Sequence, residues 1–145
     1  MRSKVLNDAD ERTFALIFET GEEPMSLLTR FAEDHEITAA RFTAIGAFSD
    51  ATIAYFDWDA KDYRRIPIDE QVEVLSLIGD VALDGATPKV HAHVVLGTRE
   101  GHARGGHLME AHVRPTLEVM LEESPRHLKR VYDAAAGLAL IRIEE

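Results

Sequence analysis

Three histidines carry the strongest chemical signal in this sequence. His91 and His93 are separated by one residue within Val90–Leu96, an apolar run whose composition predicts a β-strand. Because alternate residues of a strand point to the same face, we expect the two imidazoles to stand side by side. His107 follows two glycines, and a glycine-mediated return of the chain would bring it beside them. Three neutral imidazoles form a suitable site for Zn²⁺ or another divalent metal.

Other residues near these histidines have weaker claims to a functional role. Glu73 and Glu110 are the carboxylates that we would test first as partners orienting an imidazole, although a solvated strand face is the simpler expectation for each. Gly105 and Gly106 are expected to form a turn with positive φ that aims the following histidine. His102 is expected at an exposed hairpin tip, outside the site.

Length and composition indicate a globular protein. A chain of 145 residues with 46% hydrophobic and 29% charged residues predicts one domain over residues 1–145 with a sizeable core. It has no cysteine, which excludes disulfides and thiolate metal ligands. No apolar run is long enough to span a membrane, and Met1–Lys4 leads into polar residues rather than a signal peptide. We therefore expect a cytoplasmic protein with no membrane partner.

The charge balance opposes nucleic-acid binding. Acidic residues outnumber basic ones 26 to 16, and the net charge is −10. Proteins that bind DNA neutralise phosphates with a basic face. The basic residues at 64–65 and 126–130 are too few to form a stripe. DNA is therefore not an expected partner.

Hydrophobic periodicity predicts an α+β fold, a mostly antiparallel β-sheet system with one main helix in the N-terminal half. Many short strands joined by turns favour two packed sheets or a partial barrel. Pro24 is expected to open the helix, which should end near His35. Gly46 is a candidate bulge. The expected strands lie at 13–19, 37–47, 51–58, 63–68, 72–83, 90–96, 114–121 and 138–143, with a short helix or turn over 126–136.

An ordered set of short motifs covers most of the chain. They are Gly21–Pro24, Phe42–Asp50 with its Gly-Ala-x-Ser-Asp end, an aromatic hairpin with Tyr55, Phe56, Asp57 and Tyr63, Glu73–Gly79, Asp84–Gly85, Val90–His93, Gly105–Leu108 and the closing pieces Tyr132–Asp133 and Gly137–Leu140. In this order the motifs resemble the plants-and-prokaryotes-conserved (PPC) domain family, in its stand-alone prokaryotic type. That domain is related to the one in plant AT-hook nuclear proteins. The resemblance extends from about Arg12 to Ile143.

The resemblance implies a domain that assembles as a homotrimer. In several prokaryotic members the histidines are associated with bound zinc, which makes His91, His93 and His107 the implied metal ligands, near a subunit boundary. The Arg-Gly-Arg-Pro core of an AT-hook is absent here, so DNA binding is not implied for this chain.

Two functions therefore stand ahead of DNA binding. The first is a trimeric metal-binding protein, most simply a zinc protein, whose output is assembly or regulatory partner binding. The alternative is a metal-dependent enzyme acting on a small molecule at the three-histidine site. A site with three protein ligands leaves a position open for water or substrate, so this second function is chemically reasonable.

Overall fold

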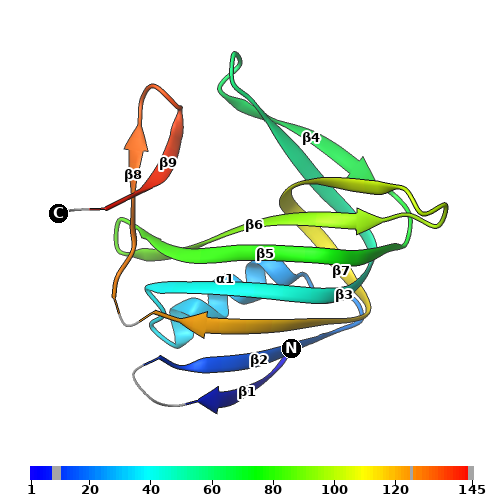
Figure 1. Cartoon of the computed structure of the whole chain (residues 1–145), viewed down its shortest axis with the longest axis horizontal. Coiled ribbons are helices and arrows are strands. Elements are labelled where there is room, and N and C mark those ends of the chain that lie inside the picture. The colour runs from blue at the N-terminus through cyan, green and yellow to red at the C-terminus, as the bar shows by residue number, and fades with distance from the viewer. Residues whose placement is uncertain (8–10, 125, 144–145) are drawn as a thin grey trace.

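The described part of the chain is a single mostly antiparallel sheet packed on one helix, which confirms the predicted α+β class (Figure 1). The computed structural model describes residues 1–7, 11–124 and 126–143. The elements are β1 (Arg2–Asn7), β2 (Thr13–Glu19), α1 (Pro24–Asp34), β3 (Ala39–Asp57), β4 (Asp62–Ile68), β5 (Val72–Asp84), β6 (Thr87–Gly97), β7 (Ala103–Glu123), β8 (Lys129–Asp133) and β9 (Leu138–Arg142).

Four strands of the sheet pair with one another in a closed circuit. β3 pairs with both β5 and β7, and β6 also pairs with both β5 and β7. These four antiparallel pairings form a circuit, which corresponds to the partial barrel rather than to two packed sheets. Strands β1 and β2 extend the sheet beyond β7, and β8 joins β5 through a short parallel pairing.

The hydrophobic core lies between the inner face of this sheet and α1. In β6 the residues Val90, Ala92, Val94 and Leu96 are buried, so the residues between them point to the outer face. The helix buries one stripe of residues against the opposite side of the core and lies behind the sheet in Figure 1. That stripe is made of Pro24, Leu28, Phe31 and Ala32.

The predicted helix is confirmed, and its ends explain its length. The Glu23 carboxylate accepts hydrogen bonds from the backbone N–H groups of Met25 and Ser26, at 3.0 and 2.7 Å. Pro24 opens the helix, where its missing N–H has no cost. At the other end, the ring of His35 stacks on Phe31 with the centroids 4.0 Å apart.

The helix or turn predicted over 126–136 is wrong for Lys129–Asp133, which forms β8, whereas residues 134–136 do lie in a turn, which leads to β9. The hairpin turn is fixed by the carboxylate of Asp133, which accepts from the N–H groups of Ala135 and Ala136 at 2.9 and 3.0 Å. Gly137 then ends the turn with a φ of 74°. Pairing with β5 at Lys129 and Arg130, and with β9 along the hairpin, provides the tertiary contacts that make Lys129–Asp133 a strand.

The strands expected at 37–47 and 51–58 are parts of one long strand, β3. Gly46 lies at a shift in register and has a φ of 154°, so the predicted bulge is confirmed and the strand bends there rather than ending. The strand expected at 114–121 is similarly only the second part of β7. These two long bent strands allow the sheet to curve into the closed circuit.

A methyl group at Gly46 would break this bend. It would lie 2.2 Å from the carbonyl oxygen of Thr116 and 2.8 Å from the Cα of Leu117, on a neighbouring backbone that has little room to move. We expect Gly46→Ala to lower the free energy of unfolding by about 1–3 kcal/mol, as measured by urea denaturation.

Gly97→Ala is the matched control. A methyl group there would meet only the side chain of Leu75, at 3.2 Å, and that flexible chain can rotate away. The control should therefore lose much less stability. Equal losses in the two variants would contradict the assigned close approach of β3 and β7.

Candidate metal centre

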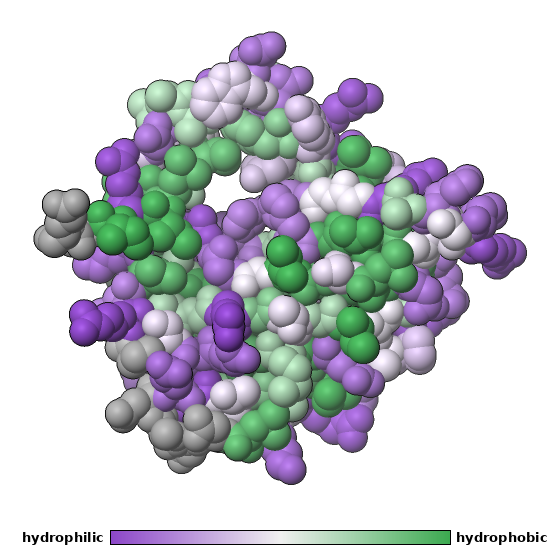
Figure 2. Space-filling view, in the orientation of Figure 1, coloured by the Kyte–Doolittle hydropathy of each residue, from purple (hydrophilic) through white to green (hydrophobic). Residues whose placement is uncertain are grey.

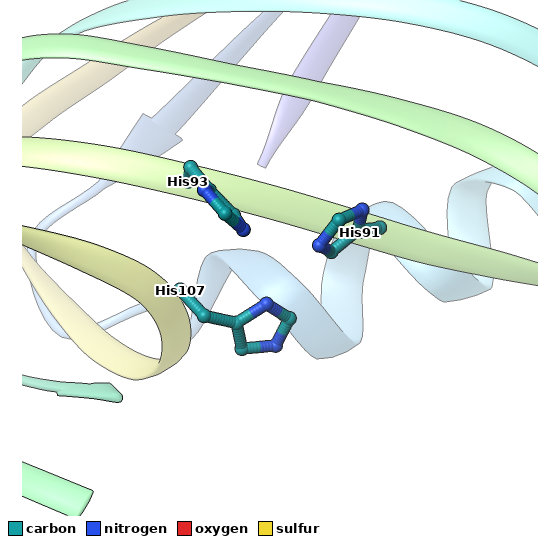
Figure 3. A group of neighbouring side chains, drawn as sticks. All are labelled: His91, His93 and His107. Atoms are coloured by element: carbon teal, nitrogen blue, oxygen red, sulfur yellow. The ribbon is translucent and has the colours of Figure 1, made fainter. Parts of the chain in front are cut away.

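His91, His93 and His107 lie together, as the spacing predicts. Each offers one ring nitrogen to a group in which all of these nitrogens are within 4.8 Å of one another. Figure 3 shows His91 and His93 side by side on β6, with a nitrogen of His107 facing them. The ring centroids are 4.9 to 5.6 Å apart.

Strand register places the third histidine. His107 is the direct antiparallel partner of His93, so both side chains leave the same face of the sheet. His91 precedes His93 by two residues and shares that face. The three ligands therefore come from two hydrogen-bonded strands, and their relative positions are fixed by backbone pairing.

The two glycines before His107 serve a different purpose from the one expected. Neither Gly105 nor Gly106 has a positive φ, because both lie within β7 rather than in a turn. A methyl group at Gly106 would lie 2.7 Å from the carbonyl oxygen of Ala54, and one at Gly105 would lie 3.0 Å from that of Val94. The glycines allow β7 to fit closely between β3 and β6 at the point where His107 leaves the sheet.

Two of the three imidazoles, those of His93 and His107, are held in the neutral form that binds metals. Burial lowers the pKa of His107 to about 4, and the nearby charges of His91, His93 and Lys89 act in the same direction. Burial also lowers the pKa of His93, assisted by the charge of His91 and opposed by Asp80. His93 and His107 are therefore neutral at pH 7, with a lone pair available to a cation.

One atom of the cluster is buried without a partner. The Nδ1 atom of His107 is inaccessible to solvent and has no hydrogen-bond partner among the described residues. A buried polar atom normally has a hydrogen-bond partner, so this free nitrogen is a candidate metal ligand. Tetrahedral zinc with imidazole ligands needs nitrogens about 3.3 Å apart, so modest side-chain rotation would close the cluster from its present spacing. The donor set fits a divalent metal.

Asp80 is the carboxylate that sequence reasoning missed. It lies opposite His91 on β5, and its Oδ2 atom is 3.5 Å from His91 Nδ1. Its other oxygen forms an ion pair with Arg130. Burial raises the pKa of Asp80, but hydrogen bonding to His91 and the charge of Arg130 outweigh burial and lower it. Asp80 is thus ionised and positioned to orient His91, as a carboxylate does for many metal-binding histidines.

The carboxylates named from the sequence lie elsewhere. Glu73 pairs with Gly97, at the far end of β6 from His91. Glu110 lies on β7 with its carboxylate 3.6 Å from Arg65. His102 is exposed at the β6–β7 turn, as expected. No local signal marks Asp80, because only the β5–β6 register brings it beside the histidines.

These features define a class of protein, an α+β domain with a three-histidine centre on the outer face of a curved sheet. The family model for the Plants and Prokaryotes Conserved (PCC) domain matches residues 6–125. The chain belongs to this family, and the resemblance noted from the sequence motifs is confirmed.

Solved structures agree with this assignment. A plant- and prokaryote-conserved (PPC) protein of Pyrococcus horikoshii is 36% identical, with a TM-score of 0.86 over 92% of this chain and 93% of that one. A metal-containing protein of Archaeoglobus fulgidus is 33% identical, with a TM-score of 0.84 over 98% and 97%. A putative DNA-binding protein of Bacteroides thetaiotaomicron, at 21% identity and a TM-score of 0.87 over 97% and 96%, shares the fold. A comparison with curated proteins finds no match.

His112, which lies outside the cluster, provides a test of the charge assignments. His112 Nδ1 lies 2.7 Å from the Asp50 carboxylate. That hydrogen bond raises the pKa of His112 and lowers the pKa of Asp50. The contribution of the pair to stability is lost as the pH rises through the raised His112 pKa. It is also lost as the pH falls through the lowered Asp50 pKa.

We expect Asp50→Asn to lower the pKa of His112 towards the ordinary histidine value, because the substitution removes the carboxylate charge and its hydrogen bond. The change is measured by following the His112 ring protons by NMR as a function of pH. Glu110→Gln removes a charge that has a smaller effect on the pKa of His112 and should produce a smaller shift. An unchanged His112 titration in Asp50→Asn would contradict the assigned pair.

Proposed function

We propose that residues 1–145 form one domain of a cytoplasmic, trimeric metal-binding protein, with zinc or another divalent ion held by His91, His93 and His107. The observation that carries this proposal is the buried, unpartnered Nδ1 of His107 beside two further imidazoles. The description of the Archaeoglobus relative as metal-containing supports it. The output that we propose is assembly or regulatory partner binding.

A metal at this centre would also provide chemistry. Three imidazoles leave an open position on a tetrahedral ion, which would act as a Lewis acid towards a bound water or small ligand. The second candidate function is therefore a metal-dependent enzyme. It is favoured by a cavity of about 310 Å³ that is lined by both His91 and His107.

An exposed apolar face of the sheet supports assembly. Ile45, Leu75, Ile78, Val95 and Met120 are exposed on β3, β5, β6 and β7, and we call this set the apolar face. In the strand register Ile78 is the direct neighbour of His93, so the apolar face adjoins the metal centre. Figure 2 shows hydrophobic side chains among polar ones on this side of the molecule. Large apolar side chains exposed together on one face of a sheet mark an interaction site, and we propose a second copy of the chain as its partner.

We do not extend DNA binding to this chain. The two relatives described as putative DNA-binding proteins are 21% and 24% identical to it, a likeness that concerns the fold. The net charge of −10 opposes contact with a phosphate backbone. Among the described residues, no helix is both long and apolar enough to cross a bilayer.

Replacing the two histidines of β6 tests the metal centre. The double variant His91→Ala, His93→Ala should fall from about one metal ion per chain to near zero, because one imidazole alone binds divalent ions weakly. Metal content is measured by plasma mass spectrometry on tag-free protein, with circular dichroism to show that the sheet persists. His102→Ala, an exposed histidine at the β6–β7 turn, is the control and should keep its metal. Stoichiometric metal retained in the double variant would contradict the site.

The assembly prediction concerns the apolar face. Ile45 is 62% exposed, so Ile45→Lys should leave the subunit folded while placing a charge within the proposed interface. Light scattering coupled to gel filtration should show a shift from three times the 16.2 kDa chain mass towards a single chain. Val5→Lys, at an exposed position on the outer strand β1, should remain trimeric. A wild-type monomer, or a trimer unaffected by Ile45→Lys, would contradict this interface.

A further inference from the structure

Two hairpins form an arch over the metal centre. The β3–β4 and β8–β9 hairpins rise from the sheet, and Figure 1 shows their tips approaching each other above β6. The tips are in contact, since a methyl group at Gly137 would lie 3.1 Å from the Cβ of Lys61. Beneath them is the cavity of about 310 Å³, visible as an opening in Figure 2. We call it the arch cavity.

Arg130 provides a polar anchor in the arch cavity. Its side chain is only 9% exposed. One terminal nitrogen forms the ion pair with Asp80, and the other donates to the carbonyl oxygen of Ala139 at 3.4 Å. The Nε atom is buried and has no hydrogen-bond partner among the described residues. A buried donor without a partner is costly, and a guanidinium N–H is well matched to a carboxylate oxygen.

The charges of the lining favour an anion of single charge. Lys89 adds a second cation beside Arg130, and Asp84 is the one carboxylate that lines the described cavity. Asp80 balances part of the Arg130 charge from outside the lining. Arg130 and Lys89 against Asp84 leave the lining with a net charge of +1, which matches a monoanion better than a phosphate dianion.

The remaining walls are apolar and the space is small. Val90, Met109, Leu138 and Leu140 line the cavity together with the ring of Tyr63. A volume of about 310 Å³ is at the low end for small-molecule sites. The ligand therefore has a short apolar body and one charged end.

We propose that the arch cavity binds a small monocarboxylate with a short aliphatic chain, whose carboxylate accepts a hydrogen bond from Arg130 Nε. His91 and His107 line the same cavity, so the bound molecule lies next to the metal centre. This second contact rests on the proposed metal function, whereas the contact with Arg130 does not. The assignment gives the metal centre a substrate or regulatory ligand of defined chemistry.

Butyrate is the test probe, and its neutral isostere butyramide is the matched control ligand. Each is titrated into metal-free wild-type protein while the methyl resonances of Met109, Leu138 and Leu140 are followed by NMR. Butyrate should produce saturable shifts in these three residues, and butyramide should bind at least about tenfold more weakly because it lacks the charge.

Two variants test the Arg130 hydrogen bond and the cavity volume separately. Arg130→Lys keeps the charge near Asp80 but removes the Nε donor, and it should weaken butyrate binding by about tenfold. Ala139→Phe leaves the Arg130 side chain in place and fills the cavity from β9, so it should abolish saturable binding. Lys89→Gln, at an exposed position, should produce a smaller loss of about threefold.

The proposal is overturned if butyramide binds as well as butyrate, or if neither Arg130→Lys nor Ala139→Phe changes the affinity. Because these titrations use metal-free protein, they give a result even if the metal proposal fails. Repeating them with zinc-loaded protein tests the second contact. Tighter butyrate binding that is lost in the His91→Ala, His93→Ala variant would support it, and equal affinity with and without zinc would overturn it.

Discussion

The register between β6 and β7 is the constraint on which the functional centre depends. The direct pairing of His93 with His107 puts two imidazoles side by side, and the two-residue period of β6 adds His91. A slip of one residue in this pairing would send His107 to the buried face and leave a pair of histidines instead of a cluster. Gly105 and Gly106 help to hold the register, because β7 can approach both neighbouring strands closely only where it has no side chains.

A second connection joins the centre to the C-terminal hairpin. Asp80 contacts His91 through one oxygen and Arg130 through the other, so a single carboxylate links β6 to β8. The same ion pair holds the β8–β9 hairpin over the sheet and thereby forms one wall of the arch cavity. The orientation of a metal-binding imidazole and the shape of the neighbouring cavity therefore depend on the same charged pair.

Local patterns in the sequence were sufficient for much of this description. The helix from Pro24, the bulge at Gly46 and the shared face of His91 and His93 all follow from short-range rules of spacing and conformation. The pieces that could not be predicted depend on pairing between distant segments. Asp80 is 11 residues before His91 and becomes its neighbour only through the β5–β6 register. The segment around Val131 has helix-forming alanines nearby, and its strand is formed through pairing with β5 and β9.

Zinc K-edge X-ray absorption on stoichiometrically loaded protein tests the central claim most directly, because it reports the ligands of the ion itself. A centre built from His91, His93 and His107 predicts three imidazole nitrogens at about 2.0–2.1 Å, with the outer-ring scattering typical of histidine and one further light ligand. A first shell of oxygen atoms without imidazole scattering would place the metal on surface carboxylates and contradict the account.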